Sequence, residues 1–84
     1  MYYVYLLESI KYKSWYIGYS TDLRKRFESH NTGRSKATKT KRPWKLIYYE
    51  AYIERLDAKK RELYLKSGAG RIFLKKQLSK YFSK

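Results

Sequence analysis

The chain has 84 residues, with 21 Lys and Arg against 7 Asp and Glu, so its formal net charge at pH 7 is +14. It contains no cysteine, which excludes disulfide bonds and thiolate metal sites. No apolar run approaches the roughly 18 residues of a membrane-spanning helix and no signal peptide is evident, so we expect a cytoplasmic protein without a membrane partner. A chain of this length can enclose one small core, and we expect a single domain over residues 1–84.

The basic residues are spread along the chain and interleaved with aromatic residues, which make up 19% of it. This pattern favours a folded nucleic-acid-binding surface over a disordered basic arm. DNA is the expected partner and RNA the alternative, while no organic cofactor is indicated and the oligomeric state is left open. Charge alone is also compatible with a basic protein that has no specific ligand and with a ribosome-associated structural protein.

Two short segments near the N-terminus predict a β-hairpin. Residues 2–7 and 15–19 are rich in aromatic, branched and long apolar side chains, and a polar turn separates them. A register that pairs Tyr5 near Tyr16 would bring both hydroxyl groups to one face of the sheet, although the sequence does not fix that register.

A helix over residues 23–31 and a third strand over residues 44–52 are predicted next. Asp22 is a helix-capping residue placed directly before the helix, and Gly33 follows as its stop signal. Between the helix and the strand, residues 34–42 form a polar, basic stretch without periodicity, which predicts a loop.

Two further helices are predicted over about residues 57–66 and 72–81. The intervening Ser67-Gly68-Ala69-Gly70 breaks the pattern, and Gly68 is expected to be a left-handed cap at the end of the first of these helices. Four residues of the last helix are expected on its inner side: Phe73, Leu74, Leu78 and Tyr81.

The predicted first helix carries an unusual stripe. Leu23, Arg26, Phe27 and His30 follow the i, i+3, i+4, i+7 spacing, so a cation and an imidazole share the face of two apolar residues. A polar break in an otherwise apolar stripe is typical of a functional site. The alternative is structural: Arg26 lays its stem along the edge of the core, and His30 lies favourably near the helix C-terminus.

The second predicted helix repeats this spacing with Ala58, Arg61, Glu62 and Leu65, so Glu62 is expected to point inward. An inward carboxylate needs either a cationic partner or a metal ion. The alternative to a metal site is an ion pair with Lys59 or Lys66, which lie three residues before and four residues after Glu62.

These residues together resemble the GIY-YIG nuclease superfamily, which includes the N-terminal half of the UvrC excision-repair nuclease. Within that superfamily, the chain looks most like the small stand-alone bacterial members. Tyr3-Val4-Tyr5 matches the GIY triplet and Tyr16-Ile17-Gly18 matches the YIG triplet. Arg26 and His30 match the arginine and the His-or-Tyr position of the following helix. Glu62 matches the single metal-binding glutamate, so the match runs over most of the chain.

The resemblance implies an α+β fold in which helices flank a three-stranded antiparallel sheet, in the order β-β-α-β-α-α. It also implies an endonuclease that hydrolyses DNA phosphodiester bonds with one divalent ion, Mg²⁺ or Mn²⁺, held by Glu62. In this hypothesis Arg26 offsets charge on the scissile phosphate, and Tyr5 or Tyr16 positions the attacking water and takes its proton. A tyrosine base requires nearby cations to lower its pKa, and His30 is the rival base.

Three features depart from the family pattern. Tyr3 takes the place of the first glycine of the GIY triplet, and Tyr19 fills a position where a small residue or lysine is frequent. No asparagine follows Glu62, although many active members have one there, and this bears on how the substrate phosphate is positioned.

The basic stretch predicts a loop that follows the phosphates of a nucleic acid, and a solvated run of charge is the alternative. Its candidate contact residues are Arg34, Lys36, Lys39, Lys41 and Arg42, with threonine hydroxyls between them. The competing function is a non-catalytic DNA- or RNA-binding module whose tyrosines stack on bases. That function explains charge and aromatics but leaves an inward Glu62 unexplained.

Overall fold

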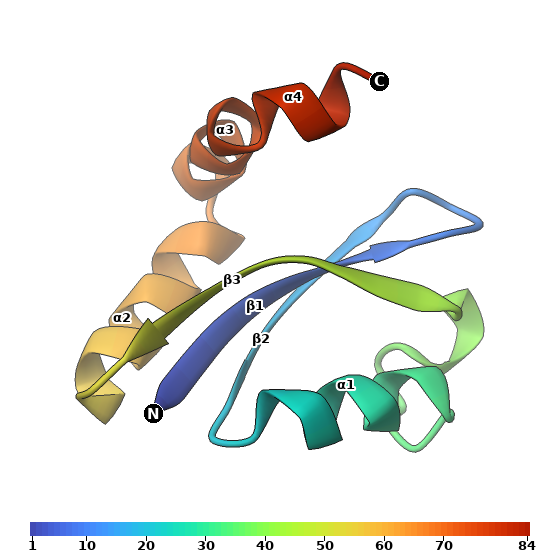
Figure 1. The fold of residues 1–84 in the computed structure, drawn as a ribbon, viewed down its shortest axis with the longest axis horizontal. Helices are drawn as coiled ribbons and strands as arrows, with labels where there is room; N and C mark the ends of the chain where they lie inside the picture. Colours follow the sequence, from blue (N-terminus) through green and yellow to red (C-terminus); the bar gives the residue numbers. More distant parts are fainter.

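The computed structural model describes residues 1–84 as one antiparallel sheet with helices on both faces (Figure 1). The strands are β1 (Tyr2–Ser9), β2 (Trp15–Ser20) and β3 (Trp44–Tyr52), and their order across the sheet is β2-β1-β3. The predicted α+β architecture with a three-stranded antiparallel sheet is confirmed. Because β1 is central and buried on both faces, it reads as an almost continuous apolar run rather than a strict alternation.

The strand register differs from the one that would place Tyr5 beside Tyr16. Tyr5 lies opposite Gly18, and Tyr16 lies opposite Leu7, two residues further along the hairpin. An offset of two residues keeps a side chain on the same face of a strand, so Tyr5 and Tyr16 still share one face. The pairing of β1 with β3 is also antiparallel and contains one irregularity between Leu6 and Leu7.

Helix α1 (Leu23–Asn31) crosses one face of the sheet, as the lower part of Figure 1 shows. The Asp22 side chain accepts a hydrogen bond from the Lys25 backbone N–H at 3.1 Å, and this bond caps the N-terminus as predicted. The backbone of Gly33 has φ +83°, which is the left-handed conformation expected just beyond a helix end. Under α1, Leu23 and Phe27 pack against a small core.

Helices α2 (Arg55–Lys66) and α3 (Gly68–Gln77) cover the opposite face, and the short α4 (Ser79–Phe82) completes the chain. Their core contains Val4 and Leu6 from β1, together with buried residues of α2 and α3: Ala58, Leu65 and Leu74. The predicted inner residues Phe73, Leu74 and Leu78 pack in this core, and Tyr81 donates a hydrogen bond to Glu8. None of the helices has the length and apolar character needed to cross a membrane.

The boundary between α2 and α3 was predicted wrongly. Gly68 is the first residue of α3 and not a left-handed cap, and α3 begins four residues before the predicted start at Ile72. Ser67 makes the break because its backbone is extended and its side chain caps α3 by accepting a hydrogen bond from Gly70 N–H. The last helix is also interrupted at Leu78, which separates α3 from α4.

Gly70 lies where α3 approaches the end of α2. A Cβ at this position would overlap the Tyr64 carbonyl oxygen and the Leu65 backbone, whereas a Cβ on Gly68 would meet nothing. We therefore expect Gly70→Ala to lower the free energy of unfolding by about 1–3 kcal/mol through overpacking. Gly68→Ala should leave stability unchanged or raise it by about 0.5–1 kcal/mol, because alanine favours a helix.

Urea unfolding of the two variants and the wild type measures this difference. Equal stability of Gly70→Ala and Gly68→Ala would contradict the close approach of the two helices.

Candidate active site

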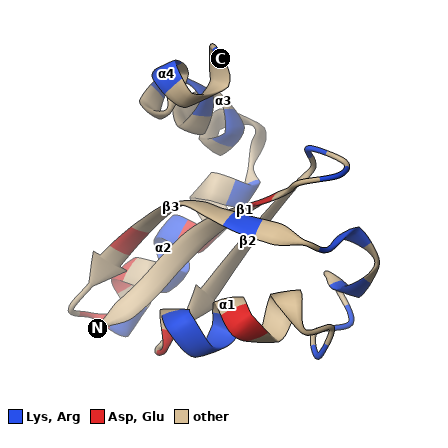
Figure 2. Cartoon of the chain, turned by 45° about the vertical axis from the view of Figure 1, so that its right-hand side comes forward, with Lys and Arg blue, Asp and Glu red and all other residues tan.

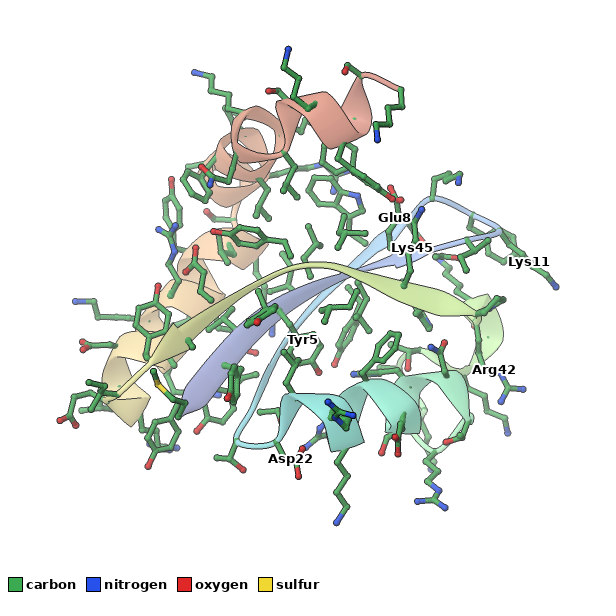
Figure 3. All side chains as sticks on the ribbon, in the orientation of Figure 1. Tyr5, Glu8, Lys11, Asp22, Arg42 and Lys45 are labelled. Carbon is green, nitrogen blue, oxygen red and sulfur yellow. The ribbon has the colours of Figure 1, made fainter.

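Tyr5 lies at the middle of the central strand and faces α1, with 2% of its surface exposed. Figure 3 shows its side chain between the sheet and that helix. Its ring lies over Gly18 on the neighbouring strand, where any Cβ would overlap the Tyr5 hydroxyl group. The tyrosine of the first triplet therefore occupies the space that the glycine of the second triplet leaves open.

The oxygen of the Tyr5 hydroxyl lies 2.8 Å from Nε2 of His30, and the two groups are hydrogen-bonded. The His30 residue is buried, with 1% of its surface exposed. The other ring nitrogen, Nδ1, lies 2.7 Å from the hydroxyl oxygen of Thr38. The carbonyl oxygen of Thr38 accepts a hydrogen bond from the Trp44 indole N–H at 2.9 Å. This chain of contacts, which we call the Tyr5–His30–Thr38 network, joins β1, α1 and the basic loop.

Tyr16 and Arg26 lie beside this network. The Tyr16 ring centre is 4.9 Å from that of His30, at an angle of 59° between the two ring planes. Arg26 is exposed on α1, and its charge acts on the pKa of both Tyr5 and His30. Two tyrosines, one histidine and one arginine from three elements are thus gathered at a single position.

The environment moves the two central pKa values in opposite directions. Burial raises the pKa of Tyr5, with smaller contributions from Tyr16 and Glu62, and this outweighs the lowering by Arg26. Burial also lowers the pKa of His30, and Arg26 lowers it further. Arg26 lowers the pKa of Tyr5 in the direction that a tyrosine base requires, but in the free protein desolvation is the larger effect, so the net shift is upward. At neutral pH both groups are uncharged.

Glu62 lies on the inner side of α2 as predicted, with 8% of its surface exposed. Its two carboxylate oxygens are paired with Lys59 at 3.1 Å and with Lys66 at 3.0 Å. Burial raises its pKa, but the hydrogen bonds from Lys66 and Lys59 outweigh burial and hold the pKa below its usual range. The ion pairs considered as the alternative to a metal site are therefore both present.

The five cationic residues predicted to contact phosphates are all exposed: Arg34, Lys36, Lys39, Lys41 and Arg42. They follow the C-terminal end of α1 along one side of the molecule (Figure 2), and Figure 3 labels Arg42 at this side. The segment is more ordered than a plain loop, since it contains a 3-10 turn (Lys39–Lys41), and the Lys41 carbonyl accepts a hydrogen bond from the Ser9 hydroxyl.

Residues 1–77 match the family described as the GIY-YIG catalytic domain. The chain belongs to the GIY-YIG family. The resemblance that the two triplets indicate is thereby confirmed, and the match covers the sheet, α1 and α2 and ends with the last residue of α3.

The relatives of this GIY-YIG chain include small bacterial proteins. It is 44% identical over 57 residues to the UPF0213 protein YazA of Bacillus subtilis. The aligned segment covers 67% of this chain and 58% of that relative. It is 42% identical over 65 residues to a UPF0213 protein of Streptococcus pneumoniae, covering 76% of this chain and 65% of the relative. The chain thus spans somewhat less than two thirds of the length of these two relatives.

The fold is similar to the solution structure of the UPF0213 protein BH0048 from Bacillus halodurans. The TM-score is 0.54 at 33% identity, and the similarity covers 88% of this chain and 82% of that one.

GIY-YIG nucleases generally depend on a divalent metal, so the residues of this chain must be tested for a fit. Glu62 is the one carboxylate whose charge acts on the pKa of Tyr5, and no group of three or more His, Cys, Asp or Glu side chains could form a metal cage. Such a donor set does not fit a tightly held structural ion. It does fit Mg²⁺, which keeps several waters and takes further oxygen ligands from substrate phosphates.

Sequence reasoning missed the residue that holds His30. The basic stretch predicts that its threonine hydroxyls contact phosphates, but Thr38 is fully buried, and its hydroxyl contacts Nδ1 of His30. No periodicity in residues 34–42 signals this role. The one available signal is that an imidazole on a buried helix face needs a partner for each of its two nitrogens.

Arg61 also has a role that its place in the α2 stripe does not reveal. Its guanidinium makes two hydrogen bonds to Glu50 on β3, at 2.8 and 3.0 Å, and two tyrosine hydroxyls donate to the same carboxylate. Both carboxylate oxygens of Glu50 are therefore paired, on the sheet face that α2 covers.

The protonation of His30 should govern stability just below neutral pH. The unfolded chain binds a proton on this residue near pH 6.5, whereas the folded protein does so only at lower pH. The unfolded state therefore binds more protons, and the free energy of unfolding should decrease as pH falls from about 6.5 toward 5.

His30 is the only histidine, so His30→Gln should flatten this part of the profile. Urea unfolding at several pH values measures both curves. An unchanged slope in the variant would contradict a neutral, buried His30.

The lysine pairs of Glu62 should compete with a metal ion for the same oxygens. Lys66→Met should therefore raise Mn²⁺ affinity, by up to about fivefold, because one surface ion pair is worth at most about 1 kcal/mol. Lys60→Met removes the same charge from α2 without breaking a pair with Glu62 and serves as the control. Electron paramagnetic resonance of free Mn²⁺ reports the binding, and equal affinities in the two variants would contradict the competition.

Proposed function

We propose that this GIY-YIG protein is a metal-dependent endonuclease that hydrolyses phosphodiester bonds in DNA. The observation that carries the proposal is the hydrogen bond between the hydroxyl of Tyr5 and Nε2 of His30. It joins a buried, protonated phenol to a neutral imidazole beside the charge of Arg26. A core that needed only packing would have no reason to enclose this pair on the face of an apolar sheet.

The pair supports a proton relay. With Nδ1–H donated to Thr38, the lone pair of Nε2 accepts the Tyr5 hydroxyl proton. Tyr5 can then take a proton from the attacking water while it passes its own proton to His30. The raised pKa of Tyr5 makes a free phenolate costly, so a simultaneous transfer to the neutral imidazole is the cheaper route. In this proposal both of the rival bases take part in one step.

Other residues have supporting roles in this mechanism. Arg26, exposed at the edge of the network, binds the scissile phosphate and offsets the charge that develops on it. Tyr16 positions the attacking water from the same face of the sheet. Glu62 would hold the divalent ion, Mg²⁺ or Mn²⁺, which when bound polarises the phosphoryl oxygen and stabilises the leaving group.

The basic loop extends the proposed binding surface away from the network. If Arg34, Lys36, Lys39, Lys41 and Arg42 neutralise five phosphates, the binding constant should fall with salt with a logarithmic slope of about −4.5. This contact is independent of base sequence, because phosphates are common to every site.

A second candidate, a non-catalytic nucleic-acid-binding module, is favoured by one observation. The two lysine pairs satisfy Glu62 without a metal, so an inward carboxylate no longer requires a catalytic explanation. Under this candidate the tyrosines and the basic loop bind the strand and no bond is broken.

Cleavage assays distinguish the two candidates. Labelled single-stranded, flap, branched and duplex DNA would be incubated with Mg²⁺ and the wild type, Tyr5→Phe, Glu62→Gln or Tyr12→Phe. Tyr5→Phe keeps the ring and loses the transferable proton, so the rate should fall by about 10²–10⁴-fold. Glu62→Gln should abolish cleavage and retain binding, and the exposed Tyr12→Phe should cleave like the wild type.

Binding without cleavage by the wild type on every substrate would support the binding module instead. Cleavage by Tyr5→Phe at the wild-type rate would overturn the proton relay while leaving the nuclease function intact.

A further inference from the structure

A pocket of about 500 Å³ opens on the same sheet face as Tyr5, between α1 and β3. Its volume is within the range of about 300–1,000 Å³ that is usual for small-molecule sites. Three apolar residues line it from α1 and β3: Leu23, Phe27 and Leu46. The proposed proton relay uses none of them.

Two tyrosines form the aromatic wall of this pocket. The rings of Tyr3 and Tyr49 lie 6.1 Å apart at an angle of 62°, which is an edge-to-face pair. Tyr49 is 53% exposed, so a large part of its ring is open to a ligand. An exposed ring above an apolar floor can accept a flat aromatic group by stacking.

The pocket adjoins the candidate active site. Tyr49 is the direct cross-strand neighbour of Tyr5, and Tyr3 lies two residues from Tyr5 on the same strand. On the other side of α1, a second pocket contains Arg26 and Lys25 and is lined only by polar or charged residues. Thr21 and Asp22 line both pockets, so the two meet at the N-terminal end of α1.

Charge indicates what kind of ligand carries the aromatic group. Arg24 lies at the aromatic pocket, Lys25 and Arg26 lie at the polar one, and the whole chain carries +14. A neutral apolar ligand would gain nothing from these cations. A nucleotide supplies both parts, a flat base for the rings and a phosphate for the arginines.

We infer that the Tyr3–Tyr49 pocket binds an unpaired nucleobase of a DNA strand, next to the phosphate held by Arg26. The inference rests on the proposed function, since it places the base beside that active site. A base inside a duplex has both faces stacked on its neighbours and cannot enter the pocket, so the pocket selects single-stranded or locally unpaired DNA. Tyr3, which stands where the GIY triplet has glycine, builds part of the wall that selects it.

Binding of DNA without metal tests this inference separately from cleavage. Single-stranded oligonucleotides carrying one 2-aminopurine would be titrated with the full chain in EDTA, and the same strands annealed as duplexes would be compared. Loss of one base–aromatic stack should weaken single-strand binding by Tyr49→Ala about tenfold, with duplex binding unchanged. Quenching of 2-aminopurine fluorescence on binding, expected for the wild type, should also be lost.

Three further variants provide the controls. Tyr49→Leu keeps apolar bulk on β3 and should lose the stack like Tyr49→Ala, which guards against a folding defect in the alanine variant. Tyr49→Phe keeps the ring and should bind like the wild type. Tyr12→Ala removes a tyrosine that is 60% exposed in the hairpin turn, outside the pocket, and should retain single-strand affinity.

Equal losses of single-strand and duplex affinity, or unchanged affinity and quenching in Tyr49→Leu, would overturn the base pocket. A wild type that binds and quenches but never cleaves with Mg²⁺ would overturn the nuclease proposal and leave the pocket supported. The two failures are therefore distinguishable.

Discussion

The hydrogen bond between Tyr5 and His30 is the contact on which the arrangement of the candidate active site depends. It is made between the central strand and the covering helix, inside the protein, where an unpaired hydroxyl or imidazole would be costly. The remaining nitrogen of the ring is satisfied by Thr38, which fixes the start of the 3-10 turn in the basic loop. One imidazole thus links the sheet, a helix and a loop, and none of these three can shift without breaking a buried polar contact.

The same constraint explains why the network is electrically neutral. A protonated histidine or an ionised tyrosine would lose its hydration in this position, and Arg26 adds repulsion for the histidine. The charges of this region lie around the network rather than in it, on Arg26, on the loop and on the lysines paired with Glu62. The neutral polar groups of the network are therefore buried, whereas the cations that can attract a polyanion lie on the surface.

Much of the fold could be predicted because its signals are local. Runs of aromatic, branched and long apolar residues indicated the strands, Asp22 indicated the start of α1, and the two triplets indicated the family. The α2–α3 boundary could not be predicted, because glycine permits several backbone conformations and only the close packing of α3 on α2 explains the need for Gly70.

The features of the candidate site that depend on local spacing could be predicted, and those that depend on long-range contacts could not. Helical spacing placed His30 and Glu62 on inner faces, and both are buried. What spacing could not reveal was the partner of His30, because Thr38 lies in a segment without periodicity. It also could not reveal that burial outweighs the lowering of the Tyr5 pKa by Arg26. The choice between lysines and a metal at Glu62 also depends on how neighbouring side chains are oriented, which no pattern along the chain encodes.

The close approach of Tyr5 to Gly18 also bears on how the strands find their alignment. A slip of one residue between β1 and β2 would exchange the two faces of β2, and a slip of two would place Tyr16 or Ser20 under the Tyr5 ring. Both of these residues carry a Cβ that would collide with the ring, so only the observed pairing gives the phenol room. Tyr5, the tyrosine proposed to move a proton, therefore also selects the strand register, because the hairpin has room for its ring in only one pairing of β1 with β2.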